Sequence, residues 1–179
     1  GTTSNLTVAK SNPENVKGLD IRDSALQVNE EAKKIKDNGE ADVVIALIHD
    51  PAKEASEKLD KDYVDFVFGG DSHIRDMNVD ADVPYFQSYE YGKIVTDLAF
   101  TFDKETKDIV SHSAEQYDIT DLEKLGITPD EEVEALVEKA KAEADELGQK
   151  VVAKVGDTFQ RGSNPGDETG TNRGTESTA

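Results

Sequence analysis

The chain of 179 residues contains no cysteine. Disulfide bonds and thiolate metal sites are therefore excluded, and the redox compartment is left open. No apolar run approaches the roughly 20 residues that a membrane-spanning helix requires, so we expect no membrane span. Residues 1–6 contain neither a basic segment nor a long apolar one. They do not have the pattern of a signal peptide, and with no initiator Met they favour a mature or truncated chain.

Basic residues are scarce. Lys and Arg number 20 against 39 Asp and Glu, which gives a formal net charge of −19. A chain of this charge repels nucleic acid and anionic membranes and tolerates divalent cations. An anionic substrate would need a metal ion or an arginine to overcome this field. A solvated acidic surface is the simpler explanation of the charge.

Hydrophobic residues make up only 35% of the chain, which predicts one domain of ordinary size with part of the chain solvated. Two continuous apolar runs, 43–48 and 64–68, have the pattern of strands buried on both faces. Pro51 opens a short helical segment between them, with Ala52, Ala55 and Leu59 on one side. Strand, helix and strand with short connections predict a βαβ unit of two parallel strands and an α/β fold.

The remaining elements are predicted from caps, apolar spacing and alternation. We expect short strands at 6–8, 84–87 and 151–155, and a weak strand or an extended entry at 16–21. We also expect a helix at 24–37 capped by Asp23 or Ser24, a hairpin of 94–102 with 109–117, and a helix at 129–148 capped by Thr128. From residue 160 onward the sequence offers nothing to bury.

Polar residues end both buried runs. His49 follows the first run, and Asp71 and His73 follow Gly69-Gly70 at the end of the second. Because parallel strands bring their carboxyl ends to one edge, these three side chains are expected to converge there. Imidazole and carboxylate are ligands for Zn²⁺, Mn²⁺ or Fe²⁺, and the alternative is that strand-end histidines cap backbone groups or face solvent. His112 lies in an alternating strand and is expected at the surface.

Other motifs near this edge are weaker. The glycine pair allows a tight turn beside a ligand, but no helix is predicted behind it, so a nucleotide-binding glycine loop is excluded. Arg75 is either a phosphate contact or a surface residue. Four aromatic side chains either stack on a ligand ring or pack over the glycine turn: Tyr85, Phe86, Tyr89 and Tyr91.

Six pieces of sequence occur in a fixed order over nearly the whole chain. They are Gly1-Thr-Thr-Ser with Asn12-Pro-Glu-Asn-Val-Lys-Gly18, Val43-Val-Ile-Ala-Leu-Ile-His49, Val64-Asp-Phe-Val-Phe-Gly-Gly-Asp-Ser-His73, the segment 87–95 with Glu90-Tyr-Gly-Lys93, the helix 129–148, and Asn172-Arg-Gly-Thr-Glu-Ser177. In this order the pieces resemble the 5′-nucleotidase branch of the calcineurin-like metallophosphoesterases.

The resemblance implies part of a four-layer α/β/β/α sandwich with a long C-terminal connector helix. It implies two divalent metal ions (Zn, Mn, Fe, Ca or Mg), with His49 and Asp71 serving one and His73 the other. The implied activity is hydrolysis of phosphate esters, typically nucleoside 5′-phosphates, outside the cytoplasm: extracellular, in a cell wall or in a periplasm. The implied divisions are 1–120 for the C-terminal half of the catalytic domain, 121–150 for the connector, and 151–179 for the flexible start of a C-terminal domain.

The sequence departs from the family pattern at several points. Asp71 stands where the family has the first histidine of Gly-His-x-His, and Asp50-Pro51 replaces a small or glycine-containing loop. The family's Asp-x-His, bridging Asp and Asn-His motifs are not in the chain. We therefore expect an incomplete hydrolase, inactive alone, whose partners are a phosphate-ester substrate and either the missing N-terminal half or a second copy. The alternative is a degenerate, non-catalytic surface or binding module.

Overall fold

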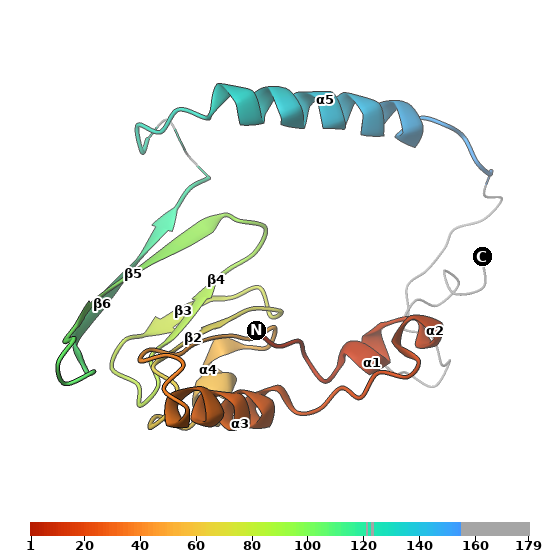
Figure 1. The fold of residues 1–179 in the computed structure, drawn as a ribbon. Helices are drawn as coiled ribbons and strands as arrows, with labels where there is room; N and C mark the ends of the chain where they lie inside the picture. Colours follow the sequence, from red (N-terminus) through yellow and green to blue (C-terminus); the bar gives the residue numbers. More distant parts are fainter. Residues whose placement is uncertain (121, 123, 155–179) are drawn as a thin grey trace. The chain divides into compact units, whose positions relative to one another are not determined.

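The computed structural model describes residues 1–120, 122 and 124–154. The chain divides into two units, Gly1–Ile127 and Thr128–Ala179, and each is described by itself. The first unit holds a four-stranded sheet with helices beside it and a separate two-stranded hairpin (Figure 1). The α/β class predicted from the sequence is confirmed, whereas the four-layer sandwich and the three domain divisions stay predictions.

The four-stranded sheet is built on the predicted βαβ unit. Strands β1 (Ile45–Leu47) and β2 (Phe66–Gly69) are parallel and are joined through helix α4 (Ala52–Ser56). Strand β4 (Tyr85–Ser88) lies parallel to β2 on its other side, and β3 (Arg75–Asn78) is antiparallel to β4, so the spatial order is β1-β2-β4-β3. The carboxyl ends of β1, β2 and β4 therefore meet at one edge.

Helix α3 (Ser24–Asp37) begins and ends as its sequence predicts. The Asp23 carboxylate accepts a hydrogen bond from the Leu26 amide at 3.0 Å, and Gly39 follows the helix with a φ of 68°. Helices α3 and α4 form a hydrophobic core together with residues on one face of the sheet. The buried residues of this core are Ala25, Ala32, Ala46, Ile48, Ala52, Ala55, Leu59, Val64, Val67, Val83 and Tyr85. A half-buried ion pair, Lys36 with Asp65 at 2.9 Å, joins α3 to the start of β2.

The prediction that the first strand is buried on both faces is wrong. Ala46 is buried, but its neighbours Ile45 and Leu47 are 41% and 58% exposed. Alternate residues of a strand face opposite sides, and in the described residues the helix-side core covers only the side of Ala46. The strand is also shorter than the apolar run, because pairing with β2 spans only Ile45–Leu47.

The predicted hairpin is confirmed as β5 (Ile94–Phe102) and β6 (Ile109–Asp118). It meets the sheet at Phe66, whose side chain lies on the opposite face from Val67. The Phe66 ring lies 5.5 Å from that of Phe100 and 5.4 Å from that of His112. The hairpin therefore covers β2 on the side away from the helices.

The short strand predicted at 6–8 is wrong, and 16–21, predicted as a weak strand or an extended entry, forms no strand. The single-turn helix α1 (Thr7–Lys10) replaces the first strand, and a second single-turn helix, α2 (Pro13–Val16), ends where the second segment begins. The Asn12 side chain accepts from the Glu14 amide at 3.1 Å, and Pro13 suits the first turn of α2. This cap stabilises α2, whereas α1 has no side-chain cap at Leu6.

Helix α5 (Glu131–Gly148) is the described helix of the second unit. It is capped by Asp130 rather than by the predicted Thr128, since the Asp130 carboxylate accepts from the amides of Glu132 and Val133 at 3.0 Å. Residues 151–154 form no strand, and the rest of the predicted last strand and the tail lie outside the described residues. None of the described helices is both long enough and apolar enough to cross a membrane.

Candidate functional site

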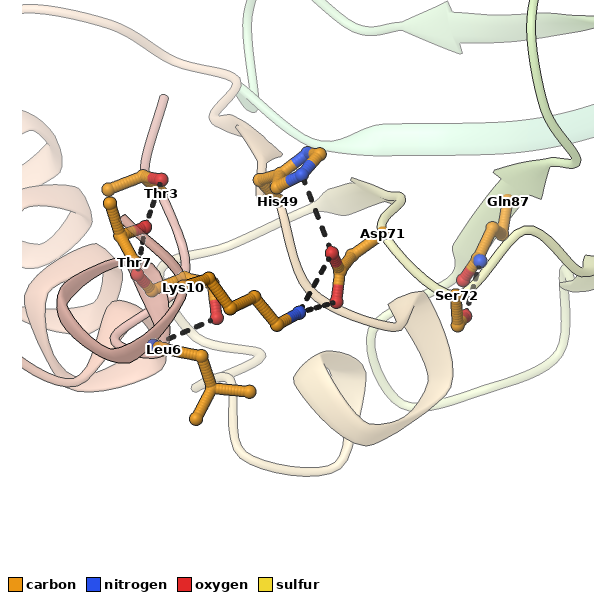
Figure 2. A network of polar contacts seen from close by, with 9 residues as sticks. Thr3, Leu6, Thr7, Lys10, His49, Asp71, Ser72 and Gln87 are labelled. Carbon is orange, nitrogen blue, oxygen red and sulfur yellow. Dashed lines mark hydrogen bonds and ion pairs between the residues drawn. The ribbon is translucent and has the colours of Figure 1, made fainter. Parts of the chain in front are cut away.

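His49 and Asp71 meet at the carboxyl edge of the parallel strands. His49 follows β1 and Asp71 follows the Gly69-Gly70 pair at the end of β2, and the Gly70 amide donates to the Asp50 carbonyl at 2.9 Å to hold the two loops together. The His49 Nε2 atom lies 3.6 Å from an Asp71 carboxylate oxygen (Figure 2). The convergence predicted from strand order is therefore present for these two residues.

Lys10 is a third member of this group. It reaches Asp71 from the end of α1, and its Nζ atom lies 3.1 and 3.3 Å from the two carboxylate oxygens (Figure 2). The Asp71 side chain is 28% exposed and that of Lys10 is 57% exposed, so solvent screens much of this attraction. Sequence reasoning missed Lys10 because the segment before it was expected to be a strand.

His73 contacts a different carboxylate. Its Nδ1 atom lies 3.0 Å from Glu90, and its ring packs edge-on against Tyr91 with 5.3 Å between the ring centres. Glu90 also accepts from Lys93 at 2.6 Å. This hydrogen bond from Lys93 is the main cause of a lowered Glu90 pKa, to which His73 also contributes. When Glu90 accepts from Nδ1–H, the Nε2 atom of His73 is left as the free acceptor, which is the arrangement that metal-binding histidines adopt.

The two loops at this edge hold four non-glycine residues in left-handed backbone. Asp71 and His73 have φ values of 63° and 52°, and Tyr89 and Tyr91 have 61° and 51°. The Tyr89 amide donates to the Ile74 carbonyl at 2.9 Å, which ties one loop to the other. Such conformations cost on the order of 1–3 kcal/mol each and gather at active sites and ligand clamps. The edge therefore concentrates backbone strain as well as polar side chains.

Gln87 positions the Asp71 loop from inside the molecule. This buried side chain accepts from the Ala52 amide at 2.9 Å. It donates to the Ser72 hydroxyl at 2.7 Å (Figure 2). It therefore links the start of α4 to the residue between Asp71 and His73. The sequence signal for it is a polar residue within the apolar run Pro84-Tyr-Phe-Gln87.

The two glycines before Asp71 have different roles. A Cβ atom on Gly69 would lie 2.5 Å from backbone atoms of Ala52, so no side chain fits between β2 and α4. A Cβ atom on Gly70 would meet only the His49 ring, at 3.7 Å. Gly69 is therefore needed for close packing of α4 at the site.

Other residues named from the sequence lie away from this group. Arg75 donates to the Gln116 side chain at 3.1 Å and to its carbonyl at 2.9 Å, so it joins β3 to β6. Tyr85 and Phe86 are buried in the sheet. His112 is exposed as expected, with Nε2 at 2.8 Å from the Val79 carbonyl.

The donor set for a metal ion is partial. His49 and Asp71 offer one nitrogen and one oxygen donor, while a structural or catalytic zinc site uses at least three protein ligands. Within the described ranges, no group of three or more His, Asp or Glu side chains is placed to hold an ion. These residues therefore do not complete a metal site by themselves, and the assignment of His49, Asp71 and His73 as ligands stays a prediction.

Comparison with known proteins gives a distant match. No family model matches the chain. The chain is similar to Endonuclease YhcR of Bacillus subtilis (strain 168), with 29% identity over 168 residues. The match covers 87% of this chain but 13% of that protein, so the chain spans a small part of the length of its relative.

Proposed function

We propose that the chain is part of a metal-dependent phosphoric ester hydrolase that acts on nucleoside 5′-phosphates. The observation that carries the proposal is the meeting of His49 with Asp71, 3.6 Å apart at the carboxyl edge of the parallel strands, where Asp71 has left-handed backbone. The distant similarity to a protein named an endonuclease supports a hydrolase of nucleotide-related substrates at a coarse level. The family resemblance of the sequence supplies the narrower substrate class.

In the proposal His49 and Asp71 are ligands of one divalent ion and His73 of a second. Two such ions polarise a phosphoryl oxygen and lower the pKa of bound water. Glu90 orients His73 by accepting from Nδ1, and Gln87 holds the loop that carries Asp71 and His73. The remaining ligands come from polypeptide outside the described residues. The ion would be Zn, Mn, Fe, Ca or Mg.

Charge supports the need for metal. The chain carries a net charge of −19, and a phosphate ester is repelled by such a field. Among the described residues, Lys10 contacts the proposed ligand Asp71, and it is already paired with that carboxylate. The proposed metal ions would supply the positive charge that a phosphate needs. Following the family resemblance, we propose that this activity lies outside the cytoplasm.

The test uses the longest open reading frame that contains these 179 residues. Phosphate release from a nucleoside 5′-monophosphate is measured with Mn²⁺ for this protein and for the 179-residue chain. The longer protein is expected to be active and the 179-residue chain inactive. His49→Gln and Asp71→Asn in the longer protein are expected to lower the rate by about 100-fold or more, as loss of metal binding does.

His112→Gln is the matched control, because this histidine contacts the Val79 carbonyl and lies in the hairpin. The rate of phosphate release in this variant is expected to stay within about threefold of the original rate, because substitutions of surface residues usually have small effects. Activity that needs no metal, or activity that survives His49→Gln, would contradict the proposed function. Activity of the 179-residue chain alone would show that the donor set does not need completion.

A second candidate is a non-catalytic binding module, and one observation favours it. The Lys10 ammonium already neutralises Asp71 at 3.1 Å, in the place of a metal charge. Divalent-ion binding is measured for the longer protein and for its Lys10→Gln variant. If neither protein binds a divalent ion, the result favours the non-catalytic binding module over the hydrolase.

A further inference from the structure

The turn between β4 and β5 holds a tyrosine in a backbone conformation that tyrosine rarely adopts. The Lys93 amide donates to the Glu90 carbonyl at 3.0 Å, and the two residues between them, Tyr91 and Gly92, have φ values of 51° and 69°. Positive φ at both central positions is the pattern of a type I′ turn, which Gly, Asn and Asp dominate. A bulky residue at positive φ is an outlier. The turn by itself therefore does not explain a tyrosine at this position.

Burial does not explain the tyrosine either. Tyr91 is 82% exposed. Its ring packs edge-on against His73, and this contact leaves most of the side chain in solvent. Non-glycine residues held in left-handed backbone gather at ligand clamps, where the surrounding structure maintains the conformation. An exposed ring held in this way is available to a ligand.

A second tyrosine borders the same surface. Tyr89 also has left-handed backbone and is 42% exposed. The Lys93 ammonium lies 5.3 Å from the centre of the Tyr89 ring and 5.6 Å from the centre of the Tyr91 ring. Glu90 holds this ammonium through a hydrogen bond of 2.6 Å. Both rings are therefore in cation–π contact with one fixed ammonium, which limits their movement.

The chemistry of this surface favours an uncharged planar ring as its ligand. Aromatic side chains stack on the faces of nucleic-acid bases, whichever base is present. An uncharged ring, unlike a phosphate, is not repelled by the net charge of −19. Tyr91 also contacts His73, a proposed ligand of the second ion. The exposed ring is thus next to the place proposed for the phosphate of the substrate.

We propose that Tyr91 determines substrate specificity by stacking on the base of a nucleoside 5′-phosphate. The inference rests on the proposed function for the position of the phosphate, and on the exposed ring in left-handed backbone for the position of the base. Lys93 steadies the ring from 5.6 Å. Phosphate esters without a planar ring lack the stacking contact and are therefore poorer ligands.

The test is an NMR titration of the metal-free 179-residue chain with adenosine, which has the base but no phosphate. A stacked purine shifts the signals of nearby ring protons, so the Tyr91 and His73 signals are expected to shift and to reach saturation. Tyr117 lies on β6 and is the internal control, whose signals are expected to stay in place. Ribose, which lacks the base, is the control ligand and is expected to shift none of these signals.

Two variants separate stacking from packing. Tyr91→Asn removes the ring and supplies a residue that type I′ turns favour, so the unfolding temperature is expected to stay the same or to rise. Adenosine is expected to bind this variant at least about tenfold more weakly, because the stack of base on ring is lost. Tyr91→Phe keeps the ring and is expected to bind adenosine within about threefold of the original affinity.

Several outcomes would overturn the inference. They are the absence of a saturable shift at Tyr91, and equal adenosine affinity of the Tyr91→Asn variant and the original chain. A lower unfolding temperature of Tyr91→Asn with unchanged adenosine binding would assign the ring to packing on His73, which also overturns it. Phosphate release by the longer protein without an adenosine shift would contradict this inference alone. An adenosine shift without phosphate release would contradict the proposed hydrolysis and support the stacking contact.

Discussion

The hydroxyl group of Thr2 is buried without a hydrogen bond among the described residues. A buried polar group without a partner costs roughly 1–3 kcal/mol in protein mutational data. The backbone of Thr2, in contrast, donates to the Leu47 carbonyl and accepts from the His49 amide.

We therefore expect Thr2→Val to leave the free energy of unfolding unchanged or to raise it by about 1 kcal/mol, since valine keeps the shape and removes the unpaired oxygen. Thr7→Val is the contrasting variant, because the Thr7 hydroxyl donates to the Ser4 carbonyl at 2.6 Å. It is expected to cost about 1 kcal/mol. Urea denaturation measures both. A larger loss for Thr2→Val than for Thr7→Val would mean that the Thr2 hydroxyl has a partner.

Gly69 and Gly70 allow a second comparison between neighbouring residues. Gly69→Ala places a Cβ atom 2.5 Å from the Ala52 backbone, whereas Gly70→Ala makes an ordinary contact at 3.7 Å. The first is expected to destabilise the fold by about 1–3 kcal/mol or more, as overpacking does, and the second by less than about 1 kcal/mol. Thermal unfolding of the two variants decides the point, and equal losses would show that α4 does not pack closely on β2.

Helices and strands were predicted correctly where the residues that determine them lie within the segment itself. Helix α3 has its cap and stop in its own sequence, and β5 with β6 has clean alternation around a polar turn. Strand β3 was not predicted, because Arg75-Asp-Met-Asn78 has few apolar residues and is held by pairing with β4. The exposed face of β1 was not predictable, because an apolar run does not reveal whether both faces are covered.

The candidate site shows the same division. The meeting of His49 and Asp71 follows from the order of parallel strands, which the sequence predicted. Lys10 and Glu90 depend on where separate loops come together, and no local pattern carries that information. The partial donor set was expected from the missing family motifs, and its completion stays a prediction.

The turn between β5 and β6 has a pH dependence. The Asp103 carboxylate accepts from the amides of Thr106 at 3.1 Å and Glu105 at 2.7 Å, and these bonds lower its pKa below the ordinary 3.8. A lowered folded-state pKa means that the stabilisation is fully present above the unfolded pKa and is lost as pH falls through the folded value.

Asp103→Asn keeps an acceptor oxygen but does not titrate. The stability advantage of the original chain over this variant is therefore expected to shrink as pH falls below 3.8. Denaturation curves of both chains between neutral and acid pH measure the difference. An advantage that grows on acidification would contradict the assigned hydrogen bonds.

At the scale of the whole molecule, charge sets the partners. The excess of 39 acidic over 20 basic residues opposes contact with a polyanion. We expect the 179-residue chain not to retain duplex DNA at an ionic strength of about 0.15 M, although its relative is named an endonuclease. A gel-shift titration tests this. Salt-sensitive binding would show that a local basic surface outweighs the net charge.

In the proposed metal site, His49 and Asp71 bind one ion and His73 binds a second. The chain has three histidines, so their imidazole proton signals can be followed one by one by NMR and assigned with His→Gln variants. Mn²⁺ broadens the signals of nuclei close to it. We expect the signals of His49 and His73 to broaden at lower Mn²⁺ concentration than the signal of His112. Parallel broadening of all three signals, or earlier broadening of His112, would contradict it.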